Sequence, residues 1–159
     1  MNPVRDEIFW GASDLAHIKV LVSRLLVAAI LGAIVGFERE EENKPAGLRT
    51  HMLVAIGSAL FVLAPVLAGI EVANLARIIQ GLTIGIGFLG GGVIIKLEGQ
   101  NRIMGLTTAA TIWLTAGIGM AVGLGALWAA VLVVCLAWIV LYAIGRLEKH
   151  AARDKVHHG

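Results

Sequence analysis

The chain has 159 residues, of which 58% are hydrophobic and 15% charged, and its mean hydropathy is +0.85. An ordinary soluble domain has about 45–50% apolar and about 25% charged residues, so the composition excludes that class and indicates a single membrane domain. The net charge of +2 comes from scattered cations, which argues against a nucleic-acid-binding surface. The single cysteine, Cys135, excludes a disulfide framework or a CxxC metal site within the chain.

Five segments are long and apolar enough to cross a bilayer, which takes roughly 20 helical residues. They are about 18–37, 50–69, 75–95, 107–123 and 126–145. A tight turn at Gly123-Leu124-Gly125 separates the last two segments, because glycine permits the backbone conformations that a helical hairpin needs. We therefore expect an all-α membrane domain of five transmembrane helices over 1–145. A short basic cytoplasmic tail over 146–159 follows it, with no soluble C-terminal domain.

The distribution of cations predicts the orientation in the membrane. Cytoplasmic loops carry an excess of Lys and Arg. With the first loop inside, nine cations are cytoplasmic and four, Arg5, Lys19, Arg24 and Arg77, lie toward the outside. The prediction is an N-terminus outside and a C-terminus in the cytoplasm. The nine are Arg39, Lys44, Arg49, Lys96, Arg102, Arg146, Lys149, Arg153 and Lys155.

The chain also repeats itself. A shift of 58 positions lays Gly32 on Gly90, and it lays the Gly-Leu-x-Thr sequence that starts at Gly47 on the one that starts at Gly105. Such internal similarity predicts two tandem helical hairpins followed by a fifth helix. Because both hairpins enter from the same side, this is a parallel repeat about an axis along the membrane normal.

Glycines spaced four residues apart predict how the helices pack. Such pairs lie on one helix face and let another backbone approach closely. The predicted pairs are Gly32 with Gly36, Gly81 with Gly85, Gly87 with Gly91, and Gly119 with Gly123. These faces and the small size of the domain predict a homodimer or higher homo-oligomer.

The run Gly90-Gly91-Gly92 goes beyond what packing requires, since three adjacent glycines cannot share one face. Two interpretations stay open. The run either serves packing, or it is a local break that exposes backbone carbonyls to a polar cavity shielded from lipid.

Polar residues form one layer toward the outside, made of Arg24, Arg77 and Gln80. An arginine inside a span is costly unless it reaches the interface or pairs with another group. Arg77 and Gln80 lie one turn apart on the third span, and Arg24 lies at a similar depth on the first. We expect the three to converge, either as structural anchors or as a functional centre.

A second polar layer lies toward the inside, at the turn between the first two helices. It contains Glu38, Arg39 and Glu40, followed by Pro45, Gly47, Arg49, Thr50 and His51. We expect Glu38 to pair with Arg49 across the turn, and Thr50 or Thr108 to cap a helix start. The alternative is a solvated cap, although glutamates at a helix C-terminus oppose its dipole.

Four motifs together resemble the MgtC/SapB family of bacterial inner-membrane proteins: GFERE, KPAGLRTHMLVAIGSALF, RIIQGLTIGIGFLGGGVI and GLTTAATIWLTAGIG. The resemblance implies five transmembrane helices and a link to magnesium limitation, intracellular survival and virulence. The best-known member is similar to a regulator that restrains the proton-driven ATP synthase, while family names refer to magnesium transport. The characteristic positions fall on Glu38, Arg39, Glu40, Pro45, Gly47, Arg49, Thr50, His51, Arg77, Gln80, Gly87 to Gly92, and Gly105 to Ala110, which include Thr107 and Thr108.

This chain departs from the family pattern in two ways. Many members carry a C-terminal domain that resembles small-molecule-binding ACT domains, whereas this chain stops about 14 residues after its last predicted helix. Gly91 stands where many members have alanine, which loosens the third helix.

Direct magnesium conduction is not favoured by the residues within the predicted spans. Mg²⁺ prefers oxygen ligands, usually carboxylates, but every Asp and Glu lies at the end of a span or in a loop, and the charges inside are arginines. We therefore expect regulation of a membrane protein partner, with transport of Mg²⁺ or another small solute by an oligomer as the alternative. No catalytic set recurs at a plausible spacing, so we expect neither an enzyme nor a cofactor, and a metal-ligand set stays unknown.

Overall fold

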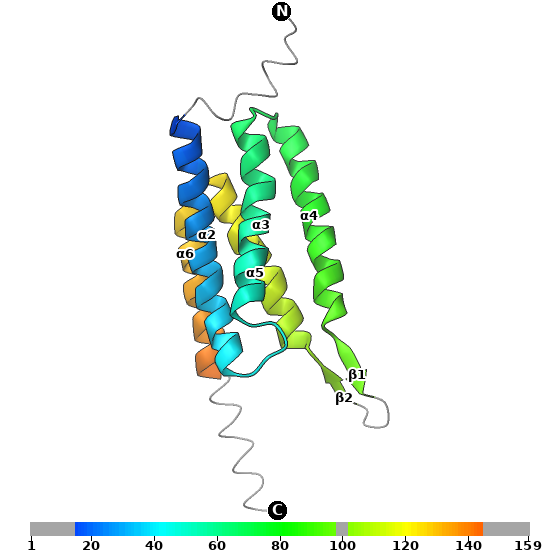
Figure 1. Cartoon of the computed structure of the whole chain (residues 1–159). Coiled ribbons are helices and arrows are strands. Elements are labelled where there is room, and N and C mark those ends of the chain that lie inside the picture. Colours follow the sequence, from blue (N-terminus) through cyan, green and yellow to red (C-terminus); the bar gives the residue numbers. More distant parts are fainter. Residues whose placement is uncertain (1–14, 98–101, 145–159) are drawn as a thin grey trace, which may run out of the picture.

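The computed structural model describes residues 15–97 and 102–144, and its helices run up and down in one bundle (Figure 1). A two-stranded antiparallel hairpin, in which Ile95 pairs with Met104, joins the third and fourth helices of the bundle. The elements are α2 (Leu15–Glu41), α3 (Leu48–Leu67), α4 (Val72–Gly92), β1 (Ile95–Leu97), β2 (Arg102–Met104), α5 (Leu106–Leu124), α6 (Leu127–Trp138) and the π-helical η1 (Ile139–Ile144) that continues α6.

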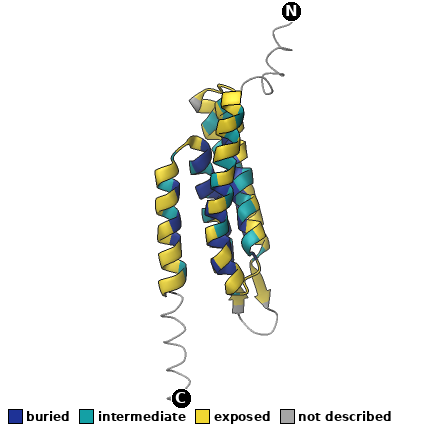
Figure 2. Ribbon diagram, turned by 60° about the vertical axis from the view of Figure 1, so that its left-hand side comes forward, coloured by how far each residue is buried: buried dark blue, intermediate teal, exposed yellow. Residues whose placement is uncertain are grey.

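The bundle confirms the predicted class, an all-α membrane protein. Four of its helices, α2, α3, α4 and α5, are long and apolar enough to cross a membrane, and a shorter apolar helix covers Leu127–Ala143. Large apolar side chains such as Phe88 and Trp128 stand exposed on the outer surface, where lipid would contact them. Figure 2 shows buried residues turned inward and exposed ones outward on the same helices.

Helix α3 lies between α2 and α4 and packs extensively against α2 and α5 (Figure 1). Helix α4 contacts α5 and α3, whereas α6 returns beside α5 and α2. The larger hydrophobic core brings together small and branched residues of α2, α3, α5 and α6. These are Ala28, Leu31, Val35, Ala55, Ala59, Ile118, Val122, Ala130 and Val134.

Glycine permits this close packing at two of the helix contacts. A Cβ on Gly32 would lie 2.7 Å from the carbonyl oxygen of His51, and one on Gly123 would lie 2.7 Å from that of Ala59. Gly36 and Gly119 also face α3 closely, so the predicted packing role of these two pairs is confirmed. By contrast, a Cβ on Gly81, Gly85, Gly87 or Gly91 of α4 would meet nothing within 4 Å.

The helix ends differ from the predicted ones where local partners decide them. Helix α2 continues to Glu41 because its last turns pack against α3, and α4 ends at Gly92 because Ile95 enters the hairpin. The turn after α5 is confirmed, with Gly125 in the left-handed conformation at φ +87°. The predicted last helix is α-helical to Trp138 and then π-helical. The predicted tail over 146–159 lies outside the described residues.

The tandem repeat stays a prediction. Gly47 and Gly105, which the 58-residue shift superposes, are the N-cap residues of α3 and α5. Gly32 lies against His51 and Gly90 against Ala109, and these contacts are related by the same shift. The connections differ, because α2 and α3 are joined by a short turn over 42–47, whereas α4 and α5 are joined through β1 and β2. The end of the bundle that holds both connections is called the hairpin end below.

Candidate functional site

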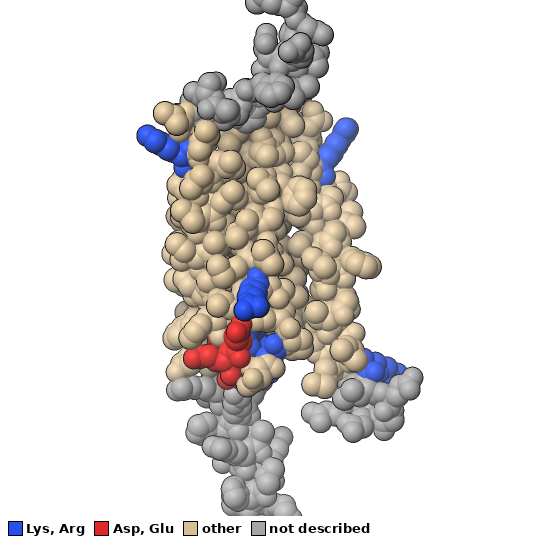
Figure 3. Space-filling view, viewed as in Figure 1, with Lys and Arg blue, Asp and Glu red and all other residues tan. Residues whose placement is uncertain are grey.

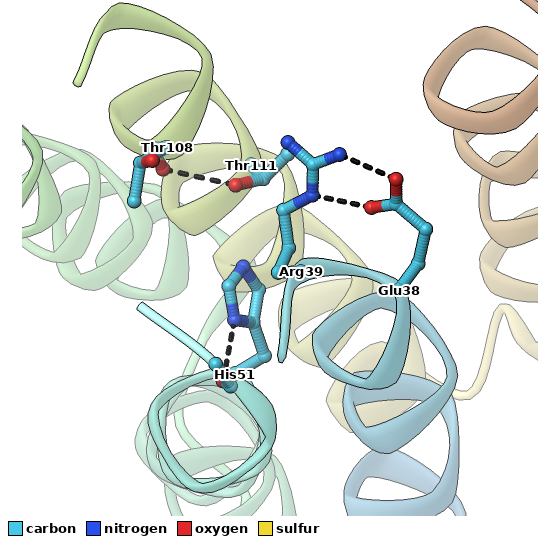
Figure 4. A network of polar contacts seen from close by, with 6 residues as sticks. Glu38, Arg39, His51, Thr108 and Thr111 are labelled. Carbon is cyan, nitrogen blue, oxygen red and sulfur yellow. Dashed lines mark hydrogen bonds and ion pairs between the residues drawn. The ribbon is translucent and has the colours of Figure 1, made fainter. Parts of the chain in front are cut away.

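A buried ion pair lies at the hairpin end, in the last turns of α2 (Figure 4). Arg39 donates from Nη2 to Oε1 of Glu38 at 2.6 Å, and its Nε contacts the other carboxylate oxygen. Glu38 is 8% exposed and Arg39 4%. The predicted partner of Glu38 was wrong, because Arg49 is exposed on α3 and the neighbouring Arg39 takes both carboxylate oxygens.

His51 of α3 is fully buried beside this pair. Its Nδ1 lies 2.9 Å from the carbonyl oxygen of Gly47. Since a carbonyl only accepts, Nδ1 carries the hydrogen, and in the neutral imidazole Nε2 is then left with a lone pair. Nε2 has no hydrogen-bond partner among the described residues, and the ring faces Arg39 (Figure 4).

Hydroxyl groups continue the buried polar region along the contact between α3 and α5. Thr108, Thr111 and Thr115 lie on one face of α5, and Thr111 donates to the carbonyl oxygen of Thr108 at 2.9 Å. Ser58 lies two turns after His51 on α3. The Ser58 and Thr115 hydroxyls are buried without a partner in the described part of the chain. Our sequence reasoning missed Ser58, Thr111 and Thr115, although their helical spacing to His51 and Thr108 was a usable signal.

Glu40 stabilises the start of α3, which corrects the predicted caps. Its Oε2 accepts a hydrogen bond from the backbone N–H of Leu48 at 2.7 Å. A Cβ on Gly47, the N-cap residue, would lie 2.5 Å from that oxygen, so a larger residue there would displace the Glu40 carboxylate. Thr50 is exposed and Thr108 is buried, and among the described residues no side-chain hydrogen bond caps α5. The glutamates at the C-terminus of α2 interact unfavourably with the dipole of that helix. This cost is offset for Glu40, because its carboxylate lies at the N-terminus of α3, where a negative charge is favourable.

The remaining predicted residues of this turn are mostly exposed. Pro45, Arg49 and Thr50 face outward, and so does Thr107 at the start of α5. The turn between α2 and α3 is closed by backbone bonds, among them Lys44 N–H to the carbonyl oxygen of Arg39 at 2.9 Å. The structure therefore brings Glu38, Arg39 and His51 together and leaves Arg49 apart from them.

The predicted outer cluster does not converge in one copy of the chain. Arg24 donates from Nη1 to the carbonyl oxygen of Gly123 at 2.8 Å, where it satisfies the C-terminal end of α5. Arg77 and Gln80 are exposed on α4, on the other side of α3. Figure 3 shows cationic side chains at two separated places near one end, further cationic and acidic side chains toward the other end, and an uncharged surface between them.

The glycine run ends α4 and does not break a span. Val93 N–H bonds to the carbonyl oxygen of Gly90 at 3.3 Å, and Ile94 N–H to that of Gly91 at 3.2 Å. Gly90 is buried against Ala109 of α5, while Gly91 and Gly92 are open. The interpretation as an interior break is therefore wrong, because these bonds tighten the last turn of a helix that leads into the hairpin.

Nothing in the described ranges groups three or more His, Cys, Asp or Glu side chains in a way that could hold a metal ion. The buried polar set is instead one salt bridge, one imidazole and four hydroxyl groups. Such a set can position helices against one another and form hydrogen bonds with water.

Together, the apolar helices and this buried polar region define a multi-spanning α-helical membrane protein. Comparison with known proteins then specifies its family. The chain belongs to the MgtC family, whose model matches residues 25–150.

Three relatives show the range of similarity. Protein SrpB of Synechococcus elongatus is 47% identical over 116 residues, which cover 66% of this chain and 63% of the relative. Protein MgtC of Salmonella typhimurium is 42% identical over 132 residues, 80% of this chain and 55% of the relative. The protein named "Putative magnesium transporter YhiD" of Escherichia coli is 44% identical over 111 residues, 65% of this chain and 51% of the relative. This chain thus spans about half to five-eighths of their lengths, and no solved structure matches it.

Proposed function

We propose that this chain is a bacterial inner-membrane protein of magnesium homeostasis that serves adaptation to low magnesium or virulence. It acts by regulating a membrane protein partner such as the ATP synthase, and it catalyses no reaction. The hairpin end faces the cytoplasm and the start of α2 faces outward. The family membership, the magnesium transport in the name of one relative and the excess of cations near the hairpin end support this proposal.

The bonding of the Glu38 carboxylate is the observation that favours regulation over direct Mg²⁺ conduction. Among the described residues, Glu38 is the one acidic side chain in the buried set. Both of its oxygens are bonded to Arg39. Mg²⁺ sheds its water reluctantly and favours carboxylate oxygens as ligands. A carboxylate whose two oxygens already bond to a guanidinium is a poor ligand for this ion. Further along the core, the buried polar groups are neutral hydroxyls.

The surface for a partner or a second copy is the open face of α4. Its glycines have no neighbour within 4 Å of a Cβ, so another backbone could approach closely there. Arg77 and Gln80 share this face and could bond across a contact between helices. We propose that this face supports a homodimer or higher homo-oligomer in the bilayer. The face comprises Arg77, Gln80, Gly81, Ile84, Gly85 and Phe88.

The test separates regulation from conduction in two preparations. In sealed liposomes that contain this protein alone and a trapped Mg²⁺-sensitive dye, we expect no Mg²⁺ entry above that of protein-free liposomes. In inverted membrane vesicles, we expect the protein to lower ATP-driven proton pumping and to co-purify with the ATP synthase after cross-linking. Mg²⁺ entry that scales with protein content and disappears in Glu38→Gln would overturn the regulatory proposal.

The second candidate is a transporter of Mg²⁺ or another small solute that works as an oligomer. The same open face of α4 favours it, because a path formed between copies would lie outside the core of one copy. Flux that appears only in preparations cross-linked as dimers or larger species would select this candidate. Loss of that flux in Gly85→Leu, with insertion intact, would place the path at α4.

A further inference from the structure

Five buried residues form a row of polar groups that the proposed regulation does not use. His51 and Ser58 lie two turns apart on α3, and Thr108, Thr111 and Thr115 lie on one face of α5. All five are at most 3% exposed. We call them the polar seam. Because α3 and α5 both start at the hairpin end and pack against each other, the seam runs from that end toward the middle of the bundle.

Three groups of the polar seam lack the partners that burial in a membrane demands. His51 Nε2, Ser58 Oγ and Thr115 Oγ1 have no hydrogen-bond partner in the described part of the chain. Each such group costs free energy unless something satisfies it. Ser58 and Thr115 lie near the middle of α3 and α5, so bulk water does not reach them along the helix surface.

The charges around the polar seam select a neutral occupant. Arg39 is neutralised by Glu38 in a two-point contact, so the seam carries no net charge at its start. Hydroxyls both donate and accept, and His51 Nε2 accepts. Water is the ligand that meets such a mixture, because a buried water makes about three hydrogen bonds to groups of this kind.

The seam begins next to exposed residues at one end and meets apolar residues at the other. At the hairpin end, Thr50 and Thr107, which precede His51 and Thr108 in the sequence, are exposed, whereas His51 and Thr108 are at most 2% exposed. Beyond Ser58 and Thr115 the same helices present Leu63, Ile118 and Val122, which are at most 1% exposed. The buried polar groups thus extend inward from the hairpin end of the bundle and stop at these apolar residues, the apolar closure.

We infer that the polar seam binds a file of water molecules which enters at the hairpin end and terminates at Ser58 and Thr115. The core of the chain thereby contains a file of water that is closed at its inner end, in addition to any surface for a partner. Water in this file satisfies His51 Nε2 and links it to the hydroxyls of α5. No water passes the apolar closure to the other side.

Cysteine accessibility tests this inference in the full chain in membranes. On a Cys135→Ala background, Ser58→Cys and Thr115→Cys are compared with their buried neighbours Ala59→Cys and Ala116→Cys. The probe is methyl methanethiosulfonate followed by mass analysis, because the reactive thiolate forms only where water reaches the sulfur. We expect the two seam positions to react at least tenfold faster than their neighbours.

Charged methanethiosulfonate reagents supplied on one side of the vesicles then define the entrance. Lys44→Cys in the turn between α2 and α3 marks the hairpin end, and Ile70→Cys marks the opposite end. The seam cysteines should be protected by blocking the side that labels Lys44→Cys. Rates equal to those of Ala59→Cys and Ala116→Cys would show a dry core and overturn the inference, and access from the Ile70→Cys side would refute the closure.

A measurement on the unaltered protein covers the case in which a cysteine variant fails to accumulate. Exchange of the imidazole C2 hydrogen in deuterated water, read by mass spectrometry, requires water at the ring. We expect measurable exchange at His51 over a period in which His17, exposed at the start of α2, exchanges fully. Absence of exchange at His51 while His17 exchanges would contradict the inference.

Discussion

The Glu38–Arg39 pair should be strongly coupled, and a double-mutant cycle measures that coupling. The two side chains are 8% and 4% exposed and contact each other through two bonds. Removing one partner of a buried pair costs about 3–5 kcal/mol, because the other charge stays buried without compensation. An exposed pair would cost only about 0–1 kcal/mol. We expect the lower end of the buried range, because the pair lies near the end of α2.

The expected values follow from the fact that each side chain has the other as its bonded partner. Glu38→Gln and Arg39→Gln should each lower the free energy of unfolding by about 3 kcal/mol. The double change removes both charges at once, so it should also cost about 3 kcal/mol or less, whereas additive effects would reach about 6 kcal/mol. The coupling free energy is then about 3 kcal/mol.

Unfolding in mixed micelles by SDS titration provides the free energies, and accumulation in the membrane provides a check in cells. The matched controls are Glu41→Gln in α2 and Arg49→Gln in α3, which change exposed side chains near the pair. Both controls should stay within about 0.5 kcal/mol of the parent. Additive single effects, or an Arg49→Gln effect as large as that of Arg39→Gln, would refute the reasoning from the buried pair.

Three further predictions concern two helix faces and the exposed Arg77. Gly119→Ala places a methyl group against the backbone of α3 and should lower the free energy of unfolding by about 1–3 kcal/mol in the same assay. The control Gly117→Ala, whose methyl group meets open space, should be neutral or stabilising by up to about 1 kcal/mol. Equal effects of the two changes would contradict the close contact at Gly119. Gly85→Leu should shift cross-linked and native-nanodisc species toward monomer while Ile84→Leu does not, and an unchanged distribution in Gly85→Leu would remove α4 from the interface. The Arg77→Lys variant should support growth at low magnesium as well as the parent protein does, since lysine reaches the membrane–water boundary as arginine does. Loss of growth with normal insertion would restore a specific role for the guanidinium.

Hydropathy alone is enough to recognise the membrane class and the positions of the long helices. An uninterrupted apolar segment of about 20 residues has few other stable environments, so α2 to α5 could be located to within a few residues. The αL turn at Gly125 was equally accessible, because glycine adopts that conformation without a Cβ penalty. The same local logic identified Gly32, Gly36, Gly119 and Gly123 as contact residues.

The spacing of residues along the sequence did not predict which groups form hydrogen bonds or ion pairs with each other at the helix ends. Glu38 was expected to reach Arg49 but bonds to Arg39, because the rotation of α2 and α3 about their axes leaves Arg49 exposed. Glu40 caps α3 in place of a threonine, since the turn brings its carboxylate over Gly47. Both outcomes depend on the position of one helix relative to another, which no local pattern encodes.

Only the tertiary arrangement decided which polar residues gather. Helix α3 lies between α2 and α4, so Arg24 caps α5 while Arg77 and Gln80 face outward. The contact of α3 with α5 buries Ser58 and Thr115, which a sequence pattern presents as ordinary polar positions within apolar helices. A hydroxyl can bond locally or stay exposed on many helix faces, and packing alone determines whether it is buried and left without a partner.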